Sequence, residues 1–214
     1  MKNMKNKNFI KLIVALIIPQ LFAIIGSLFT DTSVNSWYNL IEKPVFNPPN
    51  WVFGPVWTIL YILMGVAAFI IWRRGLEKKE IRFALLIFIF QLALNLFWSF
   101  IFFGLQNPGI ALTEIISLWF AILATILAFY QINKVAAYLL IPYILWVSFA
   151  VFLNYSIWNL NINMNISAPI AGLEIDLENK ASSDTPVLLE GLTSEVFEDE
   201  VISDEMIVEI DFED

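Results

Sequence analysis

Five apolar runs, each about long enough to cross a lipid bilayer, constrain this chain more than any other feature. Hydrophobic residues make up 59% of the sequence and charged residues only 15%, which is not the composition of an ordinary soluble domain. About 20 apolar residues in a helix cross the hydrocarbon core of a membrane. The expected spans cover approximately residues 12–29, 51–72, 83–103, 110–130 and 135–158. The sequence therefore predicts an all-α membrane protein with a bundle of five transmembrane helices.

Prolines interrupt the first and the last of these spans. Pro19 lies inside the first and Pro142 inside the fifth, and each should kink its helix because it lacks a backbone donor and crowds the preceding turn. Neighbouring helices can satisfy the carbonyl group that is left free. The first run also lacks the short core and small-residue cleavage site of a signal peptide, so we expect it to be retained as a helix.

Basic residues gather on one side of the predicted bundle. The N-terminus and the connectors at residues 73–82 and 131–134 hold ten of the 12 Lys and Arg residues, whereas the short loops of the opposite side hold Lys43 alone. Because positively charged loops stay in the cytoplasm, the sequence predicts a cytoplasmic N-terminus and an outward-facing loop at residues 31–50. The C-terminus would then also lie outside, and the cell membrane is the expected location.

The composition changes sharply after Trp158. Residues 1–159 hold eleven bases and five acids, whereas residues 160–214 hold one base and 15 acids. We predict a membrane domain at residues 1–160 and an acidic C-terminal extension at residues 161–214. Such a composition is typical of a disordered, solvated tail. Aliphatic residues scattered among the acids leave a second interpretation open, a short segment that docks on a basic surface.

The residue types that are missing exclude much catalytic chemistry. The chain has no Cys and no His, which removes disulfides, thiol nucleophiles, His-based triads and the commonest ligands of zinc and haem. Glu114 is the only acid well inside a predicted span, and without a partner acid, His or Lys it makes a poor general acid or base. It lies in the first turns of its helix, where a carboxylate can also interact with the helix dipole. We expect no metal, no required cofactor and no nucleic-acid partner.

Two amides inside the third predicted span are candidate site residues. Gln91 and Asn95 lie four residues apart and therefore on one helix face, and Trp98 follows on the same side. Amides within a membrane can hydrogen-bond across helices and hold the bundle together. Because polar groups inside a span cost free energy, they can equally line a cavity and orient the polar edge of a ligand. Residue spacing leaves both interpretations open.

An aromatic, proline-rich stretch at residues 37–61 connects the first two spans. Its prolines exclude a regular helix in the first half and stiffen the chain there. Trp57 from this stretch and Trp146 from the fifth span lie too far from the span ends to be explained as interfacial anchors. Aromatic residues at helical spacing are often only bundle core, but facing aromatic walls also suit a flat, apolar ligand.

Several motifs of this chain resemble one known family. They are Trp37-Tyr38, Lys43-Pro44-x-Phe46-x-Pro48-Pro49, Gly54-Pro55-Val56-Trp57-Thr58-x-Leu60-Tyr61-x-x-Met64-Gly65, the set Gln91, Asn95 and Trp98, and Leu140-x-Pro142-Tyr143-x-x-Trp146-x-x-Phe149-Ala150-x-x-Leu153-Asn154. In this order, over residues 9–160, they are similar to the signature of the TspO/MBR family, the tryptophan-rich sensory proteins, translocator proteins or peripheral-type benzodiazepine receptors. The acidic extension lies outside the resemblance.

The resemblance implies a five-helix bundle in the membrane, usually a homodimer, with a pocket that the first loop closes. Ligands of the family include porphyrins such as protoporphyrin IX, cholesterol in some members, and synthetic benzodiazepines. Carried over by motif, the ligand-binding residues would be Tyr38, Pro48, Phe53, Trp57, Gln91, Asn95, Trp146 and Ala150. A sterol-recognition pattern needs a base shortly after the tyrosine, and residues 156–161, which follow Tyr155, contain none, which disfavours cholesterol.

Three functions stay open at this point. The leading one is a tetrapyrrole-binding membrane sensor or regulator that holds a porphyrin by stacking and burial. In some bacterial members the tryptophans that match Trp57 and Trp146 are tied to light-dependent porphyrin breakdown, so these two would be the catalytic residues of a porphyrin-degrading enzyme. The third is a transporter of porphyrin or lipid, although inverted repeats and a charged relay are lacking.

Overall fold

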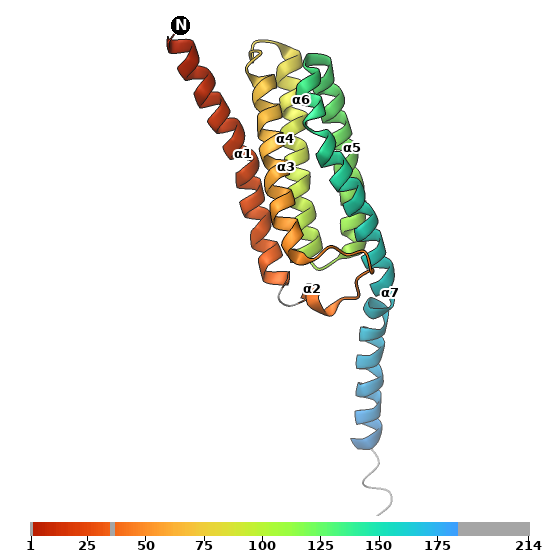
Figure 1. Ribbon diagram of the computed structural model, residues 1–214. Coiled ribbons are helices and arrows are strands. Elements are labelled where there is room, and N and C mark those ends of the chain that lie inside the picture. The colour runs from red at the N-terminus through yellow and green to blue at the C-terminus, as the bar shows by residue number, and fades with distance from the viewer. Residues whose placement is uncertain (1, 35–36, 184–214) are drawn as a thin grey trace, which may run out of the picture. The chain divides into compact units, whose positions relative to one another are not determined.

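The computed structural model describes the backbone of residues 2–34 and 37–183, and the side chains of residues 8–30 and 37–162. The chain separates into two compact units, Met1–Asn163 and Met164–Asp214, and the membrane bundle is the first of them. The described chain is helical along most of its length (Figure 1). Its elements are α1 (Lys2–Val34), α2 (Trp37–Leu40), α3 (Asn50–Trp72), α4 (Lys79–Ser99), the π-helix η1 (Phe100–Gly104), α5 (Pro108–Ile132), α6 (Lys134–Tyr138) and α7 (Ile141–Ser183).

Five helical segments of the described chain are long and apolar enough to cross a membrane. They are Asn8–Thr30, Asn50–Trp72, Lys79–Gly104, Pro108–Ile132 and Lys134–Ile162. The prediction of an all-α, multi-pass membrane protein with five spanning helices is confirmed. Helix α7 continues to Ser183, so residues 161–183 of the extension, for which the sequence favoured disorder, are helical. The rest of the predicted extension, from residue 184 onward, lies outside the described residues.

The fifth span is broken before Pro142, where the sequence predicted a kink. Helix α6 ends at Tyr138, two turn residues follow, and α7 begins at Ile141. A continuous helix would require Pro142 to donate a hydrogen bond to the carbonyl of Tyr138, and the proline ring would crowd that carbonyl. In the first turn of a new helix, Pro142 costs no backbone hydrogen bond, because the first amides of a helix have no partner within it.

The third span ends in a π-helical turn that the sequence did not predict. The amide of Leu105 donates to the carbonyl of Phe100 at 2.9 Å, five residues back. The sequence here is Phe-Ile-Phe-Phe-Gly, and such an apolar run is compatible with an α-helix and with a π-helix alike. The extra residue in the turn rotates the aromatic side chains of η1 relative to those of α4. Phe102 stacks on Trp98, four residues earlier, with ring centres 5.2 Å apart.

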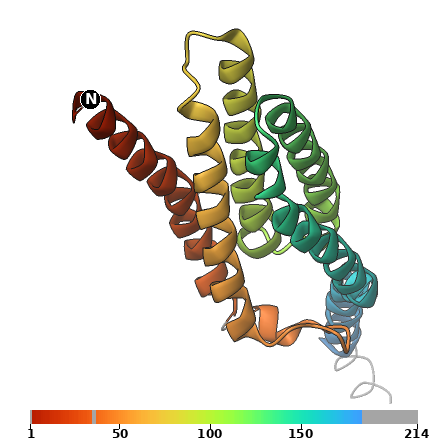
Figure 2. The same ribbon diagram turned by 45° about the horizontal axis from the view of Figure 1, so that its top comes forward.

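The core of the bundle lies between α3, α4, α5 and the α6–α7 segment. Its largest fully buried aliphatic and aromatic side chains are Met64, Ile71, Ile81, Leu92, Ile115, Leu118, Ile122, Phe129, Leu140, Tyr143 and Ile157. Lipid tails are as apolar as these side chains, so close packing rather than removal from water holds such helices together. Helix α1 packs along α3 and α4, and its N-terminal part leans away from the other helices in both ribbon views (Figure 2).

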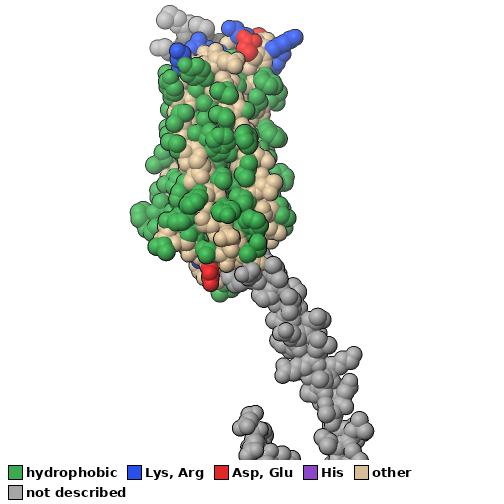
Figure 3. Space-filling view, turned by 90° about the vertical axis from the view of Figure 1, so that its right-hand side faces the viewer, with side chains coloured by type: hydrophobic (Ala, Val, Ile, Leu, Met, Phe, Trp, Pro, Cys, Tyr) green, Lys and Arg blue, Asp and Glu red, His purple; other side chains and the backbone are tan. Residues whose placement is uncertain are grey.

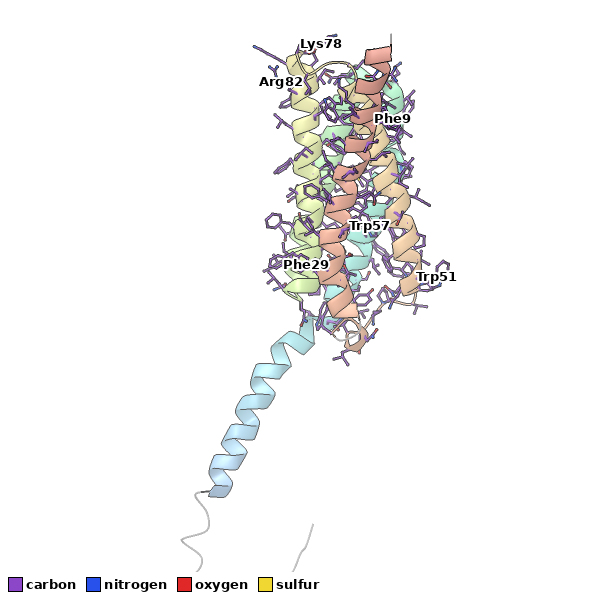
Figure 4. All side chains as sticks on the ribbon, turned by 90° about the vertical axis from the view of Figure 1, so that its left-hand side faces the viewer. Phe9, Phe29, Trp51, Trp57, Lys78 and Arg82 are labelled. Carbon is purple, nitrogen blue, oxygen red and sulfur yellow. The ribbon has the colours of Figure 1, made fainter. Side chains whose placement is uncertain are left out.

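The two ends of the bundle differ in charge. In the view of Figure 3, basic side chains gather at one end, and apolar side chains cover the face between the ends. Lys78 and Arg82 lie at the basic end, whereas Trp51 lies towards the opposite end (Figure 4). This is the charge asymmetry on which the predicted orientation rests. That the basic end faces the cytoplasm, and that the membrane is the cell membrane, stay predictions.

Candidate functional site

A cavity of about 560 Å³ opens among the helices in the half of the bundle away from the basic end. Its walls come from α1, α2, α3, α4, η1 and α7. The lining residues are Gln20, Ala23, Ile24, Gly26, Ser27, Thr30, Tyr38, Asn50, Trp51, Phe53, Gly54, Trp57, Thr58, Tyr61, Asn95, Trp98, Ser99, Phe102, Phe103, Ala150, Leu153, Asn154 and Ile157. None of these residues is an acid or a base, so the cavity is aromatic and uncharged, with hydroxyl, amide and indole groups as its polar part.

The segment from α2 to the start of α3 closes one side of this cavity. Tyr38 of α2 is only 4% exposed, and its hydroxyl donates to Oδ1 of Asn47 at 3.0 Å. Burial raises the pKa of the Tyr38 phenol above its ordinary value, and the bond to Asn47 acts in the opposite direction. Asn161 of α7 holds the same segment: its Oδ1 accepts from the amide of Glu42 at 3.0 Å, and its Nδ2 donates to the Glu42 carbonyl at 2.9 Å. The bond between Tyr38 and Asn47 therefore braces this lid, the segment at residues 37–49, internally, and Asn161 ties it to α7.

A chain of buried hydrogen bonds crosses the bundle behind the cavity. The hydroxyl of Tyr61 donates to Oδ1 of Asn95, and Nδ2 of Asn95 donates to the hydroxyl of Tyr143 at 3.2 Å. Tyr143 in turn donates to Oε1 of Gln91 at 2.9 Å, and Nε2 of Gln91 lies 3.9 Å from the sulfur of Met64. Tyr61 and Asn95 line the cavity, whereas Gln91 and Tyr143 do not. The first interpretation of the paired amides is therefore seen for both, since Gln91 and Asn95 join helices. Asn95 also faces the cavity, and a role in orienting a ligand stays a prediction.

A second polar pair lines the wall between α4 and α7. Nε1 of Trp98 donates to Oδ1 of Asn154 at 3.0 Å, and Nδ2 of Asn154 donates to the carbonyl of Pro108 at 2.7 Å. Asn154 is only 1% exposed. Asn154 was not among the residues predicted for the site, although an amide inside a predicted span is the signal that could have identified it.

The structure brings five of the eight proposed ligand-binding residues to this cavity. Those five are Tyr38, Phe53, Trp57, Asn95 and Ala150; Pro48, Gln91 and Trp146 are not among its lining residues. Trp146 instead faces a shallow apolar hollow of about 430 Å³ that it shares with Leu60, Leu145 and neighbouring side chains. Trp57 and Trp146 therefore line different spaces. Phe53, which lines the cavity, has its ring centre 6.0 Å from that of Trp146. Whether any of the eight binds a ligand stays a prediction.

Helix α1 also lines the cavity, which was not predicted from the sequence. The side chains involved are Gln20, Ala23, Ile24, Gly26, Ser27 and Thr30. Several of them are small or polar, which is unusual for a face of a helix that meets lipid. The hydroxyls of Ser27 and Thr30 donate to carbonyls of their own helix, so their oxygens keep only acceptor capacity towards the cavity.

Glu114 is the one acid of α5 and has no partner in the described part of the chain. Both of its carboxylate oxygens are buried and accept no hydrogen bond from the described residues. It does not cap its helix either, because the N-cap is Asn107, whose Oδ1 accepts from the amide of Ile110 at 3.0 Å. A buried, unpaired carboxylate costs free energy. Glu114 is not among the residues that line the cavity, so it has no direct contact with whatever the cavity holds.

At alkaline pH, where the Glu114 carboxyl group is ionised, we expect Glu114→Gln to stabilise the bundle by about 1 kcal/mol or more, because the amide keeps the shape and removes the charge. Glu114→Asp keeps the charge and serves as the control, which should not stabilise. Equilibrium unfolding of the purified protein in detergent, followed by circular dichroism, measures the difference. A Glu114→Gln variant less stable than the parent would show that the carboxylate has a partner, such as a second copy of the chain.

The five-helix bundle and its interior cavity define a multi-pass membrane protein with a cavity among its spanning helices. Comparison with known proteins makes this more specific. The family described as TspO/MBR matches residues 15–159, and the chain belongs to this family.

Individual members of the family are similar to this chain over most of the membrane domain. The tryptophan-rich protein TspO of Chlorobaculum tepidum is 46% identical over 136 residues, which cover 64% of this chain and 86% of that one. The protein of the same name from Archaeoglobus fulgidus is 44% identical over 154 residues, 72% of this chain and 99% of its own. The human translocator protein is 39% identical over 145 residues, 67% of this chain and 85% of its own. The family match ends at residue 159 and leaves the acidic extension outside.

Proposed function

We propose that this protein is a membrane sensor or regulator that binds a porphyrin or a similar flat tetrapyrrole in the cavity between α1, α3, α4 and α7. The observation that supports it is the lining, which combines aromatic rings with uncharged hydrogen-bonding groups under a lid. The volume of about 560 Å³ lies within the usual range for small-molecule sites. Names of relatives, such as tryptophan-rich sensory protein and translocator protein, fit a binding role. The resemblance also implies a homodimer, which light scattering of the purified protein would test.

Stacking and burial would supply the affinity, since the lining has no His or Cys to act as an axial ligand. Trp57 is the central aromatic group of the wall that α3 forms. Its ring centre lies 5.5 Å from that of Tyr61 and 6.2 Å from that of Tyr143, so packing holds the indole in place. A rigid aromatic wall loses little side-chain entropy when a flat ligand stacks on it.

Titration with protoporphyrin IX tests the proposal. We expect a saturable shift of the porphyrin absorption band with the parent protein. Trp57→Ala should weaken binding about tenfold or more, since truncating a buried aromatic costs more than 1.4 kcal/mol. Trp146→Ala is the matched control and should change affinity less than about threefold, because Trp146 lies outside the cavity. A non-saturable shift that equals the one in empty detergent, or equal losses in the two variants, would contradict the proposal.

Light-dependent breakdown of the bound porphyrin is the second candidate function. It is favoured by the contacts of Trp57 with Tyr61 and Tyr143, because tryptophan and tyrosine rings can donate electrons to a photoexcited ligand. Illumination of the complex separates it from simple binding. Porphyrin consumed no faster with protein than with detergent alone would exclude it.

A further inference from the structure

Positive charge gathers at one end of the bundle, around the point where α3 ends and α4 begins. The connector at residues 73–82 contains five bases and two acids, and Lys11 of α1 and Lys134 of α6 add two further positive charges. In the view of Figure 3, basic side chains crowd this end. Basic loops guide the orientation of a membrane protein, but that role requires only charge and not ordered side chains. Bases that are held in place at this end therefore point to a further role.

Two of these bases are held at the end of α3. Trp72 is the last residue of the span Asn50–Trp72, and Nζ of Lys11 lies 5.9 Å from the centre of its ring. The guanidinium carbon of Arg73, the next residue along the chain, lies 5.9 Å from the ring centre of Phe69. Cation–π contacts of this kind reduce the freedom of a long side chain, so both charges stay near the level at which the span ends.

A third base is held in the same way on a neighbouring helix. Nζ of Lys134 lies 5.5 Å from the ring centre of Tyr130, which is near the end of the span Pro108–Ile132. Lys134 begins α6, and α6 packs against α3. Figure 1 shows α6 and the α3–α4 connector at the same end of the bundle. The three held bases, Lys11, Arg73 and Lys134, are here called the basic surface.

Exposed apolar side chains adjoin this basic surface. Phe9 and Ile10 precede Lys11, and Val135 follows Lys134, and all three apolar side chains are exposed. In a membrane such side chains meet acyl chains, whereas long basic side chains reach the headgroups. A phospholipid matches both features in one molecule, whereas a free phosphate ion would use the bases alone. Seven bases against two acids at this end favour an anionic lipid over a zwitterionic one.

We propose that the basic surface binds the headgroups of anionic phospholipids, with Lys11, Arg73 and Lys134 as donors to the phosphate oxygens. Ammonium and guanidinium groups form short, charge-assisted hydrogen bonds with phosphate. Because aromatic rings already order these side chains, binding a lipid costs them less side-chain entropy than it costs a mobile lysine. The basic surface and the cavity lie in opposite halves of the bundle, and the inference does not depend on the proposed function.

The test measures which lipid the full-length protein selects. Purified protein in detergent is mixed with equal amounts of phosphatidylglycerol and phosphatidylcholine and separated from free lipid by gel filtration. Mass spectrometry of the extracted lipids gives their bound ratio, which is divided by the ratio in empty micelles. We expect a preference for phosphatidylglycerol of about fivefold or more, because one base near a membrane surface favours an anionic lipid by about this factor.

Removing the three held bases together, as Lys11→Gln, Arg73→Gln and Lys134→Gln, should reduce this preference to less than about twofold. Each of the three changes made singly should cause a smaller loss. A triple variant that selects phosphatidylglycerol as well as the parent does would overturn the inference, as would a parent protein without any preference.

The matched control replaces Arg74, Lys78 and Lys79 by Gln. It removes the same charge from the same end, but none of these three bases lies over an aromatic ring in the described part of the chain. Salt screens such exposed charges, so the control should keep most of the preference. Circular dichroism should show that both triple variants keep their helices. Equal losses in the two would show that net charge alone attracts the lipid and would overturn the basic surface as a site.

A competition experiment distinguishes the lipid from free phosphate as the ligand. Inorganic phosphate, added at the same concentration as the phosphatidylglycerol, should not displace the bound lipid, because it lacks the acyl chains that meet the exposed apolar side chains. Displacement would show that the bases bind phosphate without the rest of the lipid and would overturn the proposal.

Discussion

Ala150→Trp is expected to abolish porphyrin binding, with a loss of affinity of more than about tenfold. Ala150 lies on the α7 wall of the cavity, and an indole at this position would project into the space that the ligand needs. Overfilling a site of fixed shape also costs free energy when its walls cannot move apart. The measurement is the same absorption titration with protoporphyrin IX.

Leu145→Trp is the control for this change, because it puts the same side chain on the same helix at a position that is 64% exposed. Leu145 lines the shallow hollow beside Trp146 and not the cavity. The pair of variants therefore locates the ligand: loss of binding in Ala150→Trp places it in the cavity. Loss of binding in Leu145→Trp alone would place it in the hollow of Trp146 and would contradict the proposed site. Circular dichroism should show that both variants keep their helices.

Gly65→Ala is expected to destabilise the bundle by about 2 kcal/mol or more. A Cβ at Gly65 would lie 2.8 Å from the carbonyl oxygen of Ala15 and 2.9 Å from the Cα of Leu16. Both are backbone atoms of α1, so the methyl group fits only if the two helices separate. Helices in a membrane associate through such close approach at small residues, and separation would affect the whole contact between α1 and α3.

Gly26→Ala is the matched control on α1. There the added Cβ would lie 3.5 Å from Oγ of Ser99, an ordinary contact. The substitution should be neutral or slightly stabilising, because Ala favours a helix over Gly. Thermal unfolding in detergent, followed by tryptophan fluorescence, compares the two variants. Equal midpoints for Gly65→Ala and the parent would show that α1 is not held against α3 at this point.

The spanning helices were predictable because their signal is local. Membrane thickness sets the number of apolar residues in a row, so composition within each run was enough to count five spans. Pro142 marked the break in the fifth span for the same reason, since a proline acts on its own helix. The π-helical turn of η1 has no such local signal, and its apolar residues could continue an α-helix equally well.

The cavity was less predictable, because its lining depends on how far each helix is rotated about its own axis. Helical spacing put Gln91 and Asn95 on one face, but only the packing of α3 and α7 decided that Asn95 meets the cavity and Gln91 meets Tyr143. Helix rotation also decides the places of Trp57 and Trp146. The sequence predicted that they form opposing walls of one pocket, whereas in the structure they line different spaces. The contribution of α1 to the cavity lining could not be predicted either, because it depends on which helices pack against α1.

By itself, the sequence determined the number and approximate limits of the spanning helices, the charge asymmetry between the two ends and, through its motifs, the family. These properties follow from residues close together in the chain or from the order of short motifs. The tertiary structure alone decided which side chains share the cavity, that the lid is tied to α7 through Asn161, and that Glu114 is buried among the described residues without a partner. Each of these depends on contacts between helices far apart in the sequence, where a rotation of one helix by a single residue exchanges the side chains that meet.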